Sequence, residues 1–261
     1  MSLVASLRMR AVAMTHQGKV RDQNEDCVGI AGWVRSEPMR SPIMIECTLD
    51  EPRLCIVADG LGGHSGGEFA SMLVVRELSE TLAELASDAE IATALDRVNR
   101  RVFDVMEASP NLAGMGTTVV GLVTLDDRVC LFNIGDSRGY IQSGKYLRLL
   151  STDDTAGSAV TDPGERTGQR GHRITQCIGG LSAYSAVMPH IALAPLRAGD
   201  RFLLCSDGLT DMLDQDGIED RLSTDPFETV EQLVSAALLA GGEDNISVVV
   251  VDFLATNALP V

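Results

Sequence analysis

The chain has 261 residues, 45% of them hydrophobic and 22% charged, and its formal net charge is −16. This composition is typical of a globular protein with a sizeable core, and the acid excess disfavours nucleic-acid binding, which needs a basic surface. No apolar run reaches the length of a membrane span and the N-terminus lacks a secretory signal, so we expect a cytoplasmic protein without membrane insertion.

The first quarter of the chain is predicted to contain three strands. Residues 7–15 have the pattern of a half-buried strand, and residues 27–34 form a second strand-like segment. Residues 53–59 are a short apolar run that ends in Asp59. Residues 35–52 hold three prolines and no clear period, so we expect an irregular insertion there.

Two amphipathic helices are predicted to follow the glycine-rich segment that begins at Gly60. Apolar residues recur there at spacings of three and four, which is the period of one helix face. The two stripes are Met72, Val75, Leu78, Leu82 and Leu85, then Ile91, Leu95, Val98, Val102 and Val105. We expect a helical hairpin that begins near Glu68 and is broken near Ser87 and Asp88.

The middle of the chain is predicted to be mostly strand. Residues 116–150 contain β-branched segments with turn-forming pairs at Asp126–Asp127 and Ser143–Gly144, which predicts an antiparallel meander. Residues 151–171 lack a period and are rich in small polar residues. Loops of that length are often functional, so we expect one here.

The last part of the chain is predicted to contain a strand ending at Cys205, a helix over 226–240 and a strand over 245–253. The six cysteines are dispersed, without the close pairs of a zinc site, and are typical of buried thiols in a reducing compartment. We find no repeat and no linker, so residues 1–261 are predicted to form a single domain.

Acidic residues recur at the ends of the predicted strands. They are Asp59 in "IVADG", Asp136 in "FNIGDS", Asp207 in "LLCSDG", Glu243 and Asp244 in "GGEDN", and Glu25 and Asp26 in "RDQNED". Each one alone is best explained as a turn residue. The set is different, because strand ends in one sheet layer converge, and two carboxylates about 4 Å apart repel by on the order of 4 kcal/mol at an effective dielectric near 20.

Such a cluster persists only if it is protonated or holds cations. Oxygen-only donors without cysteine or histidine favour hard cations such as Mg²⁺, Mn²⁺ or Ca²⁺. Arg21 lies four residues before Glu25, and a guanidinium beside metal ions is suited to gripping a phosphate. The combination suggests hydrolysis at phosphorus by a metal-activated water.

Six segments, in this order, resemble the PPM-type metal-dependent serine/threonine protein phosphatases, the phosphatase 2C-like family, and in particular its bacterial branch. The segments are "GKVRDQNED", "VADGLGGHSGGEFAS", "GMGTTVVGLV", "NIGDSRGYI", "LLCSDGLTDML" and "GGEDNISVVVV". They are distributed over nearly the whole length of the chain. The resemblance implies an α+β fold, a four-layer α-β-β-α sandwich of two antiparallel sheets flanked by helix pairs.

The resemblance also implies a role for each acid. Asp59 would bridge two Mn²⁺ or Mg²⁺ ions, and a weaker third ion is possible beside Asp136. The other roles carried over are Gly60 (through its carbonyl) and Glu25 at one ion, Asp207 and Asp244 at the other, Asp26 orienting metal-bound water, and Arg21 binding the substrate phosphate. The 151–171 loop corresponds to a flap that the family uses in substrate selection. The implied partners are phosphorylated proteins and a cognate serine/threonine kinase.

One position departs from the pattern of many eukaryotic members, which carry a histidine two residues after the bridging aspartate. This chain has Leu61 there, so the group that protonates the leaving oxygen stays open. We expect His64 to be structural, Thr117 and Thr118 to bond within the strand entry, and Asp153 and Asp154 to be solvated loop acids.

Two other functions remain open from the residues alone. One is a catalytically weak relative that binds phosphoproteins, which the intact acid set disfavours. The other is a phosphohydrolase that acts on small phosphate esters, which a comparison of rates on phosphopeptides and small metabolites would distinguish.

Overall fold

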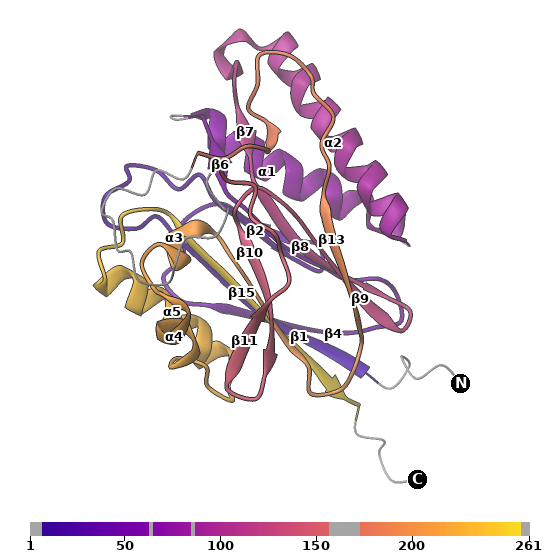
Figure 1. The fold of residues 1–261 in the computed structure, drawn as a ribbon, viewed down its shortest axis with the longest axis vertical. Coiled ribbons are helices and arrows are strands. Elements are labelled where there is room, and N and C mark those ends of the chain that lie inside the picture. Colours follow the sequence, from indigo (N-terminus) through magenta and orange to yellow (C-terminus); the bar gives the residue numbers. More distant parts are fainter. Residues whose placement is uncertain (1–6, 63–64, 85–86, 157–172, 257–261) are drawn as a thin grey trace.

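The structure is a computed structural model that describes residues 7–62, 65–84, 87–156 and 173–256. Two six-stranded antiparallel sheets lie face to face (Figure 1). The first sheet has the order β11-β10-β14-β15-β1-β4. Its strands are β1 (Leu7–His16), β4 (Ile43–Thr48), β10 (Arg138–Ser143), β11 (Tyr146–Leu149), β14 (Arg201–Cys205) and β15 (Ile246–Ala255).

The second sheet has the order β13-β9-β8-β5-β2-β3. Its strands are β2 (Cys27–Ile30), β3 (Trp33–Arg35), β5 (Leu54–Ala58), β8 (Val119–Leu125), β9 (Arg128–Ile134) and β13 (His190–Pro195). A third sheet of three short strands lies at one end, in the order β12-β7-β6. These strands are β6 (Gly60–Leu61), β7 (Gly116–Thr117) and β12 (Ile178–Gly179).

Helices cover the outer face of each large sheet (Figure 1). The helices α1 (Ser65–Glu80) and α2 (Asp88–Ala108) pack on the second sheet. The helix α5 (Pro226–Leu239) packs on the first sheet, with the short α3 (Asp207–Thr210) and α4 (Gln215–Glu219) beside it. Two 3₁₀ turns, η2 (Leu82–Glu84) and η3 (Pro110–Leu112), flank α2. The expected four-layer α-β-β-α sandwich is therefore confirmed.

The strand β15 is buried on both of its faces. Val249 and Val251 lie between the two sheets, whereas Val248 and Val250 pack toward α5. Because neither face meets water, the strand is a continuous apolar run instead of an alternating one. No helix in the described ranges is long and apolar enough to cross a membrane.

The helical hairpin is confirmed, and its second helix has a clear start signal. The Ser87 side chain accepts from the Glu90 backbone N–H at 3.3 Å and donates to Glu90 Oε2 at 2.9 Å. Ser87 is thus the N-cap, and its oxygen satisfies one of the unpaired N–H groups at the helix start. The first helix begins at Ser65, three residues before the expected Glu68.

Three strand predictions were wrong in detail. The segment predicted as an irregular insertion contains β4, which pairs with β1 through most of its length. The predicted strand over 27–34 is a hairpin, because Ala31 and Gly32 both have positive φ and form its turn. The predicted meander is divided, since β9 lies in the second sheet and β10 in the first. The single-domain expectation stays a prediction.

Candidate metal and phosphate site

The candidate site lies where the two large sheets meet at one end of the sandwich. Asp59 follows β5 of the second sheet, and two threonines of the neighbouring strand hold its backbone. The Asp59 carbonyl accepts from Thr117 Oγ1 at 2.8 Å and from the Thr118 N–H at 2.9 Å, and the Asp59 N–H donates to Thr118 Oγ1 at 3.3 Å. The expected role of both threonines at the strand entry is confirmed.

Asp207 reaches the same place from the first sheet, as the residue at which α3 begins after β14. After burial, the charge of Asp207 is the largest influence that raises the pKa of Asp59, so the two carboxyl groups lie close together. Burial, then the charges of neighbouring aspartates, raises the pKa of Asp207 to about 7 and that of Asp59 well above its ordinary value. A cation nearby would stabilise the ionised form of both carboxyl groups.

Asp26 lies beneath this pair and is completely buried. Its Oδ2 accepts a hydrogen bond from Ser206 Oγ at 2.9 Å. Burial raises the pKa of Asp26 to about 7; hydrogen bonds from Ser247 and Ser206 oppose the shift, and the charge of Asp207 adds to it. A turn aspartate normally lies at the surface, whereas Asp26 is buried and has a raised pKa. This combination favours a functional role for Asp26.

Asn245 ties the separate segments of the site together, and sequence reasoning missed it. Its Oδ1 accepts from the Glu25 N–H at 2.7 Å, and its Nδ2 donates to the carbonyls of Gln17 and Gln23, both at 2.8 Å. Its own N–H donates to Asp244 Oδ1 at 2.8 Å. One side chain thus holds the Glu25 segment against the start of β15. Its place directly after Asp244 in "GGEDN" was the available signal.

Glycines make room for the carboxylate of Glu25. A Cβ at Gly67, in the first turn of α1, would overlap Glu25 Oε2. A Cβ at Gly60 would overlap the backbone carbonyls of Gly67 and Glu25. Only a residue without a side chain fits at Gly67 beside this carboxylate.

Arg21 and Asp244 form an ion pair, with Arg21 Nη2 2.6 Å from Asp244 Oδ2. The charges of Asp59 and Glu25 also act on this guanidinium. The side chain of Arg21 is 55% exposed, so it is free to change partners at the surface of the cluster. The predicted phosphate-binding residue therefore lies directly beside the predicted ion ligands.

Asp136 lies between β9 and β10, on the side of Asp207. It is 8% exposed, and burial raises its pKa to about 6. The structure thus brings together all eight predicted site residues, with Asp136 at one edge of the group.

The donor atoms fit hard cations. Within the described ranges, Asp26 Oδ1, Asp136 Oδ1 and Asp207 Oδ1 are buried oxygens without a hydrogen-bond partner, which is unfavourable unless another positive group reaches them. No three His, Cys, Asp or Glu side chains among the described residues already surround one point as ion ligands. One of the predicted ligands, Asp244, is paired with Arg21.

The expectation that Asp153 and Asp154 are solvated was wrong. Asp153 forms a two-pronged ion pair with Arg138, whose shortest N–O distance is 2.6 Å. Asp154 accepts from the Gly135 N–H at 2.9 Å and lies 2.9 Å from His190 Nε2. Both acids anchor the start of the predicted 151–171 loop to strands. Residues 157–171 of that loop, and His64, lie outside the described residues.

Residues 44–240 match the family described as protein phosphatase 2C. The chain is 34% identical over 258 residues to the serine/threonine protein phosphatase PstP of Mycobacterium tuberculosis, and the match covers 95% of this chain and 45% of PstP. The chain thus spans about half the length of the PstP proteins that it matches. It is 32% identical over 256 residues to the serine/threonine phosphatase stp of Listeria monocytogenes, covering 94% of this chain and 96% of that protein.

Solved structures agree with the fold. The crystal structure of the M. tuberculosis phosphatase PstP/Ppp has a TM-score of 0.75 and 33% identity, covering 95% of this chain and 99% of that one. The PstP catalytic domain in complex with two manganese ions has a TM-score of 0.76 and 33% identity, covering 95% and 100% of the two chains. The chain belongs to the protein phosphatase 2C family.

Proposed function

We propose that the protein is a Mn²⁺- or Mg²⁺-dependent phosphatase that removes phosphate from phosphoserine and phosphothreonine in proteins. The observation that carries the proposal is the contact between Asp59 and Asp207, two carboxylates from different sheets, with Arg21 and Asp244 beside them. Family membership and the two manganese ions in the related PstP structure support it.

In this proposal Glu25 and the Gly60 carbonyl would hold one ion, Asp207 and Asp244 would hold the other, and Asp59 would contribute to both. Asp136 would contribute to a weaker third position. When bound, the ions supply an activated water for in-line attack on phosphorus and neutralise the phosphoryl oxygens.

The other roles belong to the chain itself. Arg21 leaves Asp244 and donates its planar fork to the phosphate oxygens of the substrate. Asp26, fixed by Ser206 from below, orients the attacking water through its partnerless Oδ1. Leu61 carries no ionisable proton, so the leaving serine or threonine oxygen takes its proton from another group.

The proposed partners are phosphorylated proteins and the serine/threonine kinase that phosphorylates them. We place the protein in the cytoplasm. The six cysteines support this, because all of them lie in the described part of the chain and none forms a disulfide there.

The proposal is tested with p-nitrophenyl phosphate and a phosphothreonine peptide, each in Mn²⁺ and in EDTA. We expect turnover of both substrates only with Mn²⁺, and a loss on the order of 10³-fold for Asp207→Asn. Asp126→Asn, in the exposed turn between β8 and β9, is the matched control and should keep full activity. The mechanism is wrong if Mn²⁺ gives no turnover or if Asp207→Asn remains active. Peptide binding without hydrolysis would favour a binding protein instead.

A further inference from the structure

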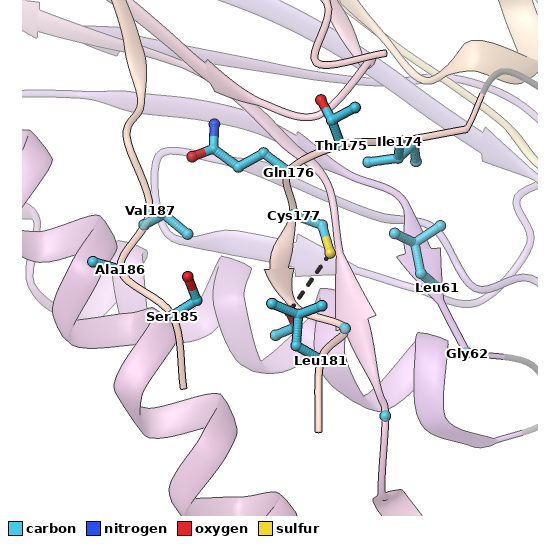
Figure 2. Close-up of a pocket in the computed structure, with 13 residues that line it drawn as sticks. Leu61, Gly62, Ile174, Thr175, Gln176, Cys177, Leu181, Ser185, Ala186 and Val187 are labelled. Carbon is cyan, nitrogen blue, oxygen red and sulfur yellow. Dashed lines mark hydrogen bonds between the residues drawn. The ribbon is translucent and has the colours of Figure 1, made fainter. Parts of the chain in front are cut away.

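A cavity of about 470 Å³ opens beside the candidate site (Figure 2). Leu61 forms part of its wall and directly follows Gly60, a predicted ion ligand. Figure 2 shows Leu61, Cys177 and Leu181 around the same space, contributed by segments far apart in the chain. The cavity therefore adjoins the segment that carries a predicted ion ligand.

Contacts to α2 hold one wall of the cavity in place. Asn99, a fully buried residue of α2, accepts from the Gly179 N–H at 2.9 Å and donates to the Ser185 carbonyl at 2.8 Å. Tyr184 Oη donates to Asp96 Oδ1 at 2.6 Å, and the Tyr184 ring lies under Arg100 with 4.0 Å between the guanidinium carbon and the ring centre. The wall is thus preformed and does not need a ligand to assemble it.

The opposite end of the same wall is held by Gln176. Its Oε1 accepts from the Met188 N–H at 2.6 Å, and its Nε2 donates to the Met188 carbonyl at 3.0 Å. The Gln176 Nε2 also lies 3.0 Å from Asp154 Oδ2, so the wall is joined to the anchored start of the 151–171 loop. Both ends of the segment between Cys177 and Met188 are therefore fixed to the scaffold.

The chemistry of the cavity contrasts with that of the metal and phosphate site. None of its thirteen lining residues is acidic or basic, in a chain with a formal net charge of −16. Burial, then the charge of Asp136, raises the pKa of Cys177 to about 11, so its thiol is neutral at physiological pH. Among the lining residues, Leu61, Ile174, Leu181 and Val187 supply apolar side chains, and Leu181 is 53% exposed. An uncharged cavity that holds these side chains can accommodate an apolar ligand group.

We propose that this cavity binds a large apolar side chain of the phosphoprotein substrate, within a few residues of the phosphoserine or phosphothreonine. The inference rests on the proposed function. Its physical basis is that Leu61 of the cavity wall directly follows Gly60, and that burying the half-exposed Leu181 against an apolar group is favourable. The cavity thereby selects substrates by the residue next to the phosphorylated one.

The test is a set of phosphothreonine peptides in which leucine is moved through each position on either side of the phosphothreonine, in a background of serine and alanine. With the wild-type chain in Mn²⁺, we expect leucine at one position to raise kcat/KM about tenfold over serine, mainly through KM. In Leu181→Ser the ratio for that position should fall to about one. Leu193→Ser changes a leucine on β13 that is 48% exposed and outside the cavity, and it should keep the wild-type ratio.

The outcomes separate this inference from the proposed function. Hydrolysis of p-nitrophenyl phosphate and of all peptides at one common rate would overturn the cavity proposal and leave the phosphatase intact. No hydrolysis of any substrate in Mn²⁺ would overturn both. A leucine preference that survives in Leu181→Ser would also contradict the proposal. A Leu181→Ser variant that changes only the melting temperature would contradict the proposal as well, because Leu181 would then serve the fold and not the substrate.

Discussion

Arg21 Nη2 lies 2.6 Å from Asp244 Oδ2, so a cationic side chain occupies a carboxylate that is proposed to hold an ion. The pair is partly exposed, with 55% of the Arg21 side chain and 33% of the Asp244 side chain accessible. Such a pair is weak enough to open, since exposed ion pairs contribute roughly 0.2–1 kcal/mol. Arg21 thus has two alternative partners, Asp244 and the substrate phosphate.

Removing this arginine should have opposite effects on ion binding and on turnover. In Arg21→Ala we expect the Kd for Mn²⁺, measured by calorimetry, to fall about two- to fivefold because the competing cation is gone. At saturating Mn²⁺, kcat/KM for a phosphothreonine peptide should fall about 10- to 100-fold, because the phosphate loses its two-pronged donor. Arg128→Ala, which removes another exposed arginine, should change neither value. Weaker Mn²⁺ binding in Arg21→Ala would show that the arginine supports the ions instead of competing with them.

Adjacent glycines in α1 offer a matched pair of substitutions. In Gly67→Ala the added methyl would overlap Glu25 Oε2 and must displace that carboxylate. In Gly66→Ala the added Cβ lies 3.4 Å from Met115 Cβ, an ordinary contact, and alanine favours the helix. We expect Gly67→Ala to weaken Mn²⁺ binding at least about tenfold, whereas Gly66→Ala keeps wild-type affinity and activity. Equal behaviour of the two variants would exclude the proposed role of Glu25 as a ligand.

The sequence predicts the convergence of the acids because the signal is local. Asp59 directly follows an apolar strand, Asp207 follows another after Ser206, and strand ends in packed sheets meet at the edges of the sandwich. The strand β4 was missed because three prolines around it obscured a short alternating segment. The division between β9 and β10 has no local signal, since only their pairing partners show which sheet each joins.

The partners of Asp153 and Asp154 were unpredictable for a similar reason. Arg138 is 15 residues from Asp153, and His190 is 36 residues from Asp154. The composition of a run of acidic and small polar residues does not show whether its carboxylates are hydrogen-bonded to water or to a distant side chain. Asn245 shows the same limit, because the three hydrogen bonds of its side chain reach segments that only the folded chain brings together.

Loss of the Asn245 side chain should loosen both sides of the site together. Asn245→Ala leaves the Glu25 N–H and the carbonyls of Gln17 and Gln23 without their partner, at a cost of about 2–3 kcal/mol in the free energy of unfolding. Because the Glu25 segment is then no longer held, we expect Mn²⁺ affinity to fall as well. Urea unfolding and Mn²⁺ titration measure the two effects.

Asn99 provides the comparison for that variant. It is also buried, its Oδ1 accepts from the Gly179 N–H at 2.9 Å and its Nδ2 donates to the Ser185 carbonyl at 2.8 Å, and neither partner is a predicted site residue. Asn99→Ala should destabilise the fold by a similar amount and leave Mn²⁺ affinity close to wild type. A drop in affinity that is the same in both variants would assign the effect to general loosening of the fold.

The buried acids also predict how stability depends on pH when EDTA removes divalent ions. Folding raises the pKa of Asp26 from 3.8 to about 7, so between these values the folded protein binds a proton that the unfolded chain has released. The free energy of unfolding must therefore fall as pH rises from about 4 to about 7. Asp26→Asn removes the charge that causes this loss, and should be more stable than wild type at pH 8 by on the order of 2 kcal/mol, with little difference at pH 4. The same variant should have lost most phosphatase activity in Mn²⁺.

Melting temperatures across this pH range test the prediction, with Asp126→Asn as the exposed control that keeps the wild-type profile. Parallel profiles for wild type and Asp26→Asn would show that the burial of Asp26 carries no such cost.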